Sequence, residues 1–268
     1  MTGPIILPTF NEFAIEFGGF GIRWYALAYI VGLLAGLFIL RREARKPGAP
    51  LSSDQLDVLL NYVLIGIILG GRFGFVMFYN LEYYLGHPLE IFKIWQGGMS
   101  FHGGLLGVSA AMIIFARRHR ISVLNISDRV AMVVPIGLGL GRLSNFINGE
   151  LFGRPTDVPW AMVFPRGGDI GRHPSQLYEA GLEGLILGGI MLVMARRGAL
   201  KRPGILTGIL LAGYGVARFA IEYVREPDPQ LGTLVGMMTM GQLLCLPMIA
   251  AGLYLFMARP ADGPRDRG

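Results

Sequence analysis

The sequence predicts an all-α integral membrane protein with seven transmembrane helices. Three observations support this class. The composition is 53% hydrophobic and only 16% charged, the mean hydropathy is +0.51, and the apolar residues form separate long stretches. Soluble domains carry about 25% charged residues, and a spanning helix needs about 17–25 apolar residues. We therefore expect residues 1–268 to form a single polytopic membrane domain.

The predicted spans cover, in chain order, residues 24–40, 56–79, 99–116, 130–147, 177–195, 204–224 and 234–258. Residues 1–21 are too polar to span and are expected to form an arm at the membrane surface. Residues 148–174 are rich in Gly, Pro, Asp and Arg and are expected to form a long loop. The 40 glycines are explained mainly by close packing between membrane helices.

Four basic clusters give the predicted orientation. They follow the first, third, fifth and seventh spans and hold 14 of the 24 lysines and arginines. Because alternate crossings put all four clusters on one side, the positive-inside rule predicts that this side is the cytoplasm. The N-terminus is then outside and the C-terminus is cytoplasmic. This distribution also explains the net charge of +6 without nucleic acid as a partner.

Cysteine and histidine usage gives no indication of a metal or cofactor. Cys245 is the single cysteine and lies in an apolar run, so it is interpreted as a core residue and a disulfide framework is excluded. The four histidines are scattered and lack the spacing of a metal motif. We expect a protein without a metal.

Polar residues from five predicted spans fall at the same outer level of the membrane. They are Tyr25, Arg72, His102, Arg142, Asn145, Asn148, Tyr214, Arg218 and Glu222. Polar groups within the membrane are costly and usually functional, and the inner halves of the spans contain few. The pattern predicts a site at the outer leaflet.

Spacing adds detail to this site. Arg142 and Asn145 are three residues apart, and Tyr214, Arg218 and Glu222 are each four apart, so each set shares a helix face. Arg142 has no acidic residue three or four positions away, so its partner comes from another helix or from a ligand. A guanidinium fork matches phosphate geometry, which indicates an anionic lipid headgroup or another anion. Alternatively, Arg218 and Glu222 form an ordinary buried ion pair.

His102 lies between two glycine pairs within residues 97–104. An imidazole is usable as a base near neutral pH, and the glycines leave it approachable. The alternatives are a helix cap or a packed polar side chain.

Four segments of the chain resemble signature segments of the bacterial prolipoprotein diacylglyceryl transferase family. They are residues 97–104 (GGMSFHGG), 141–150 (GRLSNFINGE), 172–179 (RHPSQLYE) and 213–218 (GYGVAR), the last followed by Glu222 and by residues 225–228. They occur in the family's order across nearly the whole chain. The sequence departs from the usual family residues at Gln96, Ser144, Phe152 and Tyr223, and none of these departures removes a charged site residue.

The resemblance implies an enzyme of the bacterial inner membrane whose active site faces the outer leaflet, with the N-terminus and residues 148–174 in the periplasm. Such an enzyme transfers the diacylglyceryl group of phosphatidylglycerol to the lipobox cysteine of a prolipoprotein, forming a thioether and releasing glycerol phosphate. The implied partners are phosphatidylglycerol, prolipoprotein signal peptides with a lipobox cysteine, and membrane lipids. No cofactor is implied.

The resemblance also implies roles for individual residues. The expected catalytic residues are His102, Arg142, Tyr214 and Arg218. The expected substrate-binding residues are Tyr25, Asn145, Glu150, Gly153 and Glu222. As a hypothesis, His102 is the general base and the arginines stabilise the departing phosphate; hydroxide or a tyrosinate are the alternative bases. An anion or lipid transporter is the alternative function, and it predicts polar residues continuing through the inner halves of the spans.

Overall fold

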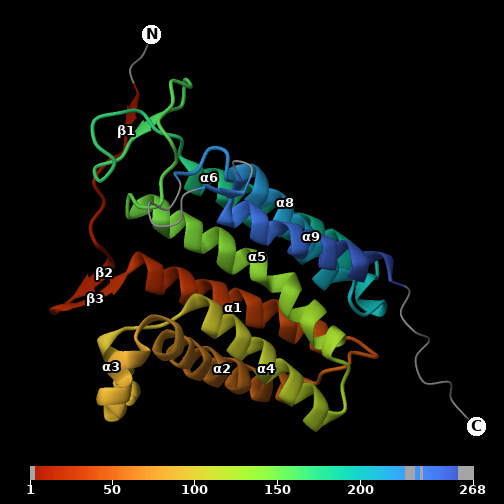
Figure 1. The fold of residues 1–268 in the computed structure, drawn as a ribbon. Coiled ribbons are helices and arrows are strands. Elements are labelled where there is room, and N and C mark those ends of the chain that lie inside the picture. Colours follow the sequence, from red (N-terminus) through yellow and green to blue (C-terminus); the bar gives the residue numbers. More distant parts are fainter. Residues whose placement is uncertain (1–3, 227–232, 236–237, 259–268) are drawn as a thin grey trace, which may run out of the picture. The chain divides into compact units, whose positions relative to one another are not determined.

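The computed structural model describes residues 4–226, 233–235 and 238–258 of a mostly helical chain (Figure 1). Its longer helices are α1 (Trp24–Ala44), α2 (Ser53–Tyr79), α4 (Phe101–His119), α5 (Val123–Ile147), α7 (Leu187–Arg196), α8 (Ile205–Ile221) and α9 (Met240–Met257). The short helical segments are α3 (Leu81–Gly86), α6 (Ser175–Glu179), three 3₁₀ turns, η1 (Pro88–Phe92), η2 (Ile94–Gln96) and η4 (Ala199–Lys201), and a π-helical segment, η3 (Ala180–Ile186).

In the described part of the chain, five helical stretches are long and apolar enough to cross a membrane: Trp24–Ala44, Ser53–Tyr79, Val123–Ile147, Ser175–Arg196 and Met240–Met257. The helix Ile205–Ile221 is apolar but shorter. These helices confirm a helical membrane protein, whereas the number of seven spans and their orientation stay predictions. The basic residues predicted at 259–267, residues 236–237 of the last predicted span, and positions 227–228 of the fourth motif lie outside the described residues.

Side-chain caps explain where several helices begin. Ser52 and Gln55 form a capping box at the start of α2, and Thr239 and Gln242 form another at the start of α9. Such caps satisfy amide groups that the first helical turn leaves without partners. These capped starts differ by a few residues from the boundaries expected from hydropathy, 56 and 234.

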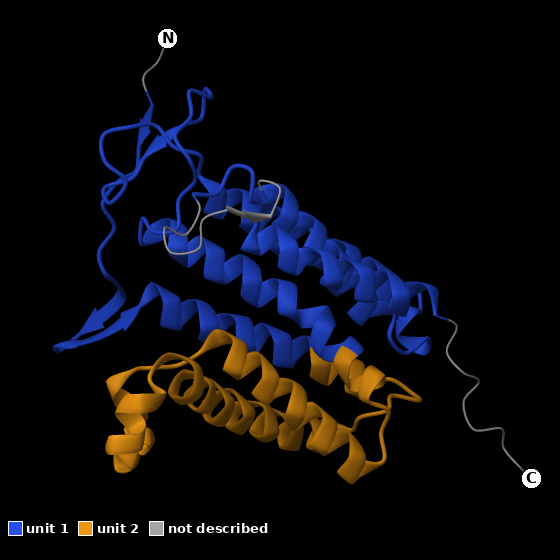
Figure 2. Cartoon of the chain, viewed as in Figure 1, with its two compact units in different colours: residues 1–39, 128–268 blue, residues 40–127 orange. Residues whose placement is uncertain are grey.

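The chain forms two compact units, residues 1–39 with 128–268 and residues 40–127 (Figure 2). The expectation of a single polytopic domain stays a prediction.

Glycines bring α2 and α4 into close contact within the unit of residues 40–127. Gly66, Gly70 and Gly74 recur every four residues along α2 and face Gly103 and Gly107 of α4. A β-carbon at Gly74 would lie 2.7 Å from Cα of Gly103, and one at Gly66 would lie 2.6 Å from the carbonyl oxygen of Gly107. Small residues at this spacing let membrane helices approach closely, so the glycine content follows from helix packing here.

Arg72 has a structural place in the same unit. Its side chain is buried, and its guanidinium carbon lies 5.1 Å from the ring centre of Tyr84. The guanidinium donates to four backbone carbonyls, those of Glu90 (2.6 Å), Ile91 (2.7 Å), Gly97 (2.7 Å) and Gly98 (3.1 Å). Arg72 therefore holds the segment between α3 and α4 against α2 instead of presenting a free charge to an anion.

We expect Arg72→Lys to lower the free energy of unfolding by about 3 kcal/mol, because one ammonium group cannot satisfy acceptors on both sides of a guanidinium and buried carbonyls lose their donors. The thermal unfolding midpoint in detergent measures this. Arg45→Lys, at an exposed position, is the matched control and should leave the midpoint unchanged. Equal midpoints for the two variants would contradict this assignment.

Asp128 of α5 caps α8 within the other unit. Its carboxylate accepts hydrogen bonds from the backbone N–H groups of Gly204 and Thr207, both at 2.8 Å, and from the Thr207 hydroxyl at 2.6 Å. The N-cap position of α8 is Gly204, which has φ +99° and offers no side chain. A carboxylate from a neighbouring helix therefore satisfies the first turn of α8.

The N-terminal arm is made of short strands. Residues Ile5–Ile6 (β1) pair in parallel with Met162–Val163 (β4), so the arm is joined to the loop expected at residues 148–174. Residues Phe13–Phe17 (β2) and Phe20–Arg23 (β3) form a hairpin that leads into α1. A further pair joins Thr233–Val235 (β5) and Met238–Thr239 (β6) before α9. The sequence did not predict these strands.

Candidate active site

The expected site residues fall in both units. His102 lies in the unit of residues 40–127. The other eight lie in the unit that contains α5, α6 and α8: Tyr25, Arg142, Asn145, Glu150, Gly153, Tyr214, Arg218 and Glu222.

A buried cluster of arginines and glutamates forms the centre of the larger group. Arg142 of α5 places Nε 3.3 Å from Oε2 of Glu179 and 3.6 Å from Oε2 of Glu183. Arg218 of α8 places Nη1 3.7 Å from Oε1 of Glu179, and Arg225 places Nη1 3.0 Å from the same oxygen. Both glutamate side chains are fully buried. Of the two partners expected for Arg142, another helix or a ligand, the structure shows carboxylates of another helical stretch.

Glu222, the residue directly after α8, completes the cluster. Its Oε2 lies 2.7 Å from Nη1 of Arg218, as the spacing of four residues predicts. Its Oε1 accepts a hydrogen bond of 2.8 Å from the hydroxyl of Thr239. Because Arg218 also approaches Glu179, the Arg218–Glu222 pair belongs to a larger network instead of standing alone. Tyr214 lies one turn before Arg218 on the same helix.

Glu179 closes the third signature segment, residues 172–179, but neither it nor Glu183 was among the expected site residues. They lie four residues apart at the beginning of an otherwise uncharged apolar stretch, and this spacing was the available signal. Glu179 ends α6, and Glu183 lies in the π-helical segment η3. Segments of π-helix inside longer helices are frequent at functional sites.

Glu150 organises the turn after α5. Its Oε1 accepts hydrogen bonds from the side-chain amides of Asn145 at 3.0 Å and Asn148 at 3.2 Å. Its backbone carbonyl accepts from Nε2 of Gln176 at 2.7 Å. The expected donor Asn145 is therefore already oriented by Glu150, and its binding role stays a prediction.

Gly153 lies where two backbone segments cross. Its N–H donates to the carbonyl of His173 at 2.8 Å, and it forms a β-bridge with Arg225. A β-carbon at Gly153 would meet the carbonyl oxygen of Val224 and lie 2.7 Å from Cβ of His173. The glycine therefore permits a close approach that places Arg225 beside the cluster.

We expect Gly153→Ala to lower the free energy of unfolding by about 1–3 kcal/mol, because the added methyl group forces the backbone segments apart. Transfer activity should fall with it, since Arg225 would shift away from Glu179. The unfolding midpoint and the activity of the purified variant measure both effects. Gly189→Ala is the control, because a β-carbon there meets nothing within 4 Å. A Gly153→Ala variant indistinguishable from this control would contradict the role.

Tyr25 lies at the beginning of α1, next to a contact with α5. Its ring stands edge-on to Tyr29 with ring centres 4.9 Å apart. The Ser144 hydroxyl donates to the carbonyl of Trp24 at 3.2 Å. This bond joins the start of α1 to the turn of α5 that carries Arg142.

His102 is exposed in the first turn of α4. The cap of that helix is Ser100, whose hydroxyl accepts from the N–H of Gly103 at 3.2 Å. His102 contacts the ring of Phe101 edge-on, with ring centres 5.7 Å apart, and makes no hydrogen bond to a described residue. Its imidazole is thus neither a helix cap nor a packed polar group in this structure.

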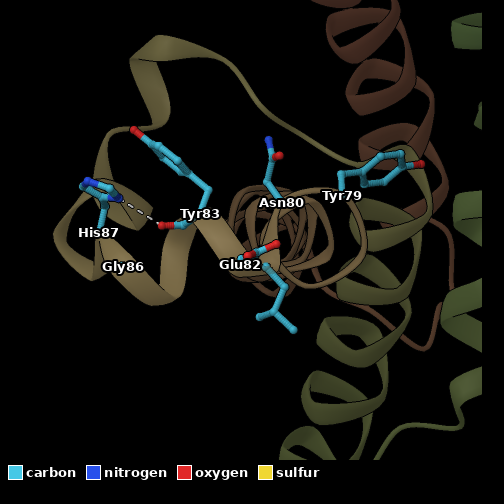
Figure 3. A pocket seen from close by; sticks show the side chains of 7 residues that line it. Tyr79, Asn80, Glu82, Tyr83, Gly86 and His87 are labelled. Carbon is cyan, nitrogen blue, oxygen red and sulfur yellow. Dashed lines mark hydrogen bonds between the residues drawn. The ribbon is translucent and has the colours of Figure 1, made fainter.

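A cavity of about 460 Å³ lies at the end of α2 and along α3 (Figure 3). Residues between Tyr79 and His87 line it, and none of the expected site residues is among them. Beside it, the Tyr83 hydroxyl donates to Glu90 at 2.6 Å, and this hydrogen bond lowers the pKa of the Glu90 carboxyl. Because none of the expected site residues lines it, the cavity is not the candidate active site.

Together, the apolar helices and the buried charges define a helical integral membrane protein with an arginine–carboxylate site within its helices. The chain matches the family model of prolipoprotein diacylglyceryl transferase over residues 12–258. It belongs to the prolipoprotein diacylglyceryl transferase family.

Similar proteins cover nearly its full length. A protein of Nitrobacter hamburgensis is 54% identical over 268 residues, covering 97% of this chain and 92% of the relative. One of Rhodospirillum rubrum is 53% identical with 97% of both chains covered, and one of Gluconobacter oxydans is 51% identical with 98% of both covered. All three are named phosphatidylglycerol–prolipoprotein diacylglyceryl transferase. The family resemblance of the sequence motifs is confirmed.

Proposed function

We propose that this chain is a transferase that moves the diacylglyceryl group of phosphatidylglycerol to prolipoproteins. The observation that carries this function is the identity of more than half of the residues with relatives of that name over nearly the full chain. The arginine cluster supports it, because phosphatidylglycerol has an anionic headgroup that guanidinium groups bind well.

The acceptor atom in this proposal is the thiol of a lipobox cysteine in the prolipoprotein. The thiol sulfur attacks the glyceryl carbon that carries the phosphate, a C–S bond forms, and the C–O bond breaks. The thiol proton passes to a base and glycerol phosphate leaves. The single cysteine of this chain, Cys245, is buried in α9, which fits a reaction whose nucleophile belongs to the substrate.

Arg142 and Arg218 are assigned to the departing phosphate. A phosphodiester carries one negative charge and its monoester product approaches two, so donors placed for the added charge favour the transition state over the bound lipid. The carboxylates contact Nε of Arg142 and Nη1 of Arg218. Oε2 of Glu179 and both carboxylate oxygens of Glu183 accept no hydrogen bond from a described residue, so these ion pairs leave N–H donors of Arg142 for phosphate oxygens.

The other expected residues have supporting roles in the proposal. Asn145 is a neutral donor held by Glu150, and Glu222 orients Arg218. Tyr25 and Tyr214 position the headgroup or the incoming thiol. His102 takes the thiol proton, and its exposed imidazole fits a contact with a substrate.

The proposed setting is the bacterial inner membrane with the site toward the outer leaflet. Seven spans, a periplasmic N-terminus and a cytoplasmic C-terminus are supported by the basic clusters between apolar stretches. Each predicted span coincides with a described helix or helical stretch.

The function is tested by incubating the purified full-length protein with phosphatidylglycerol and a lipobox peptide. We expect a peptide heavier by one diacylglyceryl group and an equal amount of glycerol phosphate. Absence of both products would contradict the transferase. A flux of labelled lipid or anion in proteoliposomes without these products would indicate the transporter instead.

A further inference from the structure

We propose that Glu179 is a positioning residue that sets the spacing of three arginines for the departing phosphate. The inference rests on the proposed function, because the reaction gives the arginines their task. Glu179 takes no part in the bond changes of the transfer reaction, and the proposal gives it a role in placing the residues that do.

The geometry places Glu179 at the centre of the cluster. Its carboxylate meets one nitrogen from each of three arginines: Nε of Arg142 at 3.3 Å, Nη1 of Arg218 at 3.7 Å and Nη1 of Arg225 at 3.0 Å. These arginines come from α5, from α8 and from the residues that follow α8. Within the described part of the chain, no other carboxylate contacts three basic side chains.

The three arginines and Glu179 stabilise one another electrostatically. Three guanidinium groups in one partly buried place repel one another, and the repulsion is stronger there than in water. A carboxylate with 0% exposure is itself costly unless it is paired. Glu179 therefore offsets the repulsion of the arginines while they offset the cost of burying it. Among the ion pairs of the described residues, Glu183 pairs with Arg142 at 3.6 Å and Glu222 pairs with Arg218 at 2.7 Å, so neither links all three arginines.

The contacts leave guanidinium nitrogens for a ligand. Glu179 and Glu183 approach Arg142 through Nε, and Glu179 and Glu222 approach Arg218 through Nη1. Oε2 of Glu179, both carboxylate oxygens of Glu183 and Oε2 of Glu222 accept no hydrogen bond from a described residue. The carboxylates thus hold the arginines by charge and leave guanidinium N–H donors for a ligand. This is the arrangement that a site needs for developing charge.

Glu179→Gln keeps the size of the side chain and removes its charge, so the site becomes more positive by one. We expect anionic phosphatidylglycerol to bind as well as before or more tightly, and KM for the lipid not to rise. We expect kcat to fall about 100-fold, because misplacement of catalytic groups by about 1 Å has an effect of that size. Replacing a residue that is needed only for folding would not lower kcat of the folded enzyme while leaving KM for the lipid unchanged.

The experiment compares four full-length proteins, wild type, Glu179→Gln, Glu179→Asp and Asp128→Asn, in mixed micelles with varied phosphatidylglycerol. Thermal unfolding midpoints are measured beside kcat and KM. Asp128→Asn is the matched control, because it alters a buried carboxylate that caps α8 and should lower the unfolding midpoint while kcat per folded molecule is retained.

Glu179→Asp keeps the charge but shortens its reach by one methylene, so about a tenfold fall in kcat with unchanged KM is expected. If Glu179→Gln does not fold, kcat and KM of Glu179→Asp test the proposal in its place. A wild-type kcat in either folded variant, or a raised KM with unchanged kcat, would overturn the proposal. A wild-type protein that forms no lipidated peptide would overturn the proposed function, and that result is distinct from an active wild type with an equally active Glu179→Gln.

Discussion

Arg142→Lys is expected to lower kcat for diacylglyceryl transfer by about 100- to 1000-fold, the usual effect of removing one donor that stabilises developing charge. Lysine keeps the positive charge but has a single nitrogen. Nε of Arg142 lies 3.3 Å from Glu179 and 3.6 Å from Glu183, and the oxygens at these distances accept no hydrogen bond from a described residue, which leaves guanidinium N–H donors for phosphate oxygens. The single nitrogen of a lysine ammonium cannot contact the carboxylates and also bind two phosphate oxygens in the geometry of a guanidinium group.

The measurement is steady-state transfer by the purified variant, with the unfolding midpoint determined in parallel. Arg166→Lys is the control, because Arg166 is exposed in the loop between β4 and α6. Its kcat should equal that of the wild type. A near-normal kcat for Arg142→Lys would argue against bidentate phosphate recognition by this residue.

His102→Gln is expected to lower kcat by about 100- to 10,000-fold, the range for losing a general base. Glutamine can form hydrogen bonds but cannot accept the proton of the substrate thiol, so the variant should lose the contribution of this base to the rate. The exposed position of the imidazole, without a hydrogen bond to a described residue, leaves both ring nitrogens accessible to a substrate thiol.

Transfer measured against pH decides between His102 and the other bases. His119→Gln is the control, because His119 stacks on Phe115 at the opposite end of α4 and its replacement should preserve the pH profile. An unchanged rate and profile in His102→Gln would eliminate it as the base and favour hydroxide or a tyrosinate.

The helices were predictable from the sequence because apolar length alone defines a spanning helix. Boundaries were less predictable, because charged residues inside helices were read as their ends. The fourth span was expected from residue 130, but α5 begins at Val123. Asp128 ended the apolar run in the sequence, whereas in the structure its carboxylate is buried as a cap for α8.

The site was predictable in part. The spacing of Arg218 and Glu222 gave a contact that the structure contains, and the absence of a nearby acid correctly indicated a distant partner for Arg142. The identity of that partner depends on how α5 and α6 pack, which no local spacing encodes. Arg72 was grouped with the site residues in the sequence, but it donates to backbone carbonyls in the structure. A sequence cannot tell whether the acceptors of a buried arginine are carbonyls or a ligand.

The claim that the phosphate departs from the glyceryl carbon, which gives the arginines their task, is tested most directly by following an isotope label. Phosphatidylglycerol is prepared with oxygen-18 as the bridging oxygen between the diacylglyceryl carbon and phosphorus. The masses of the products formed by the wild-type enzyme are measured by mass spectrometry. Attack at carbon predicts that all of the label leaves in glycerol phosphate and none enters the peptide. Label in the peptide product, or a peptide carrying phosphorus, would contradict the account.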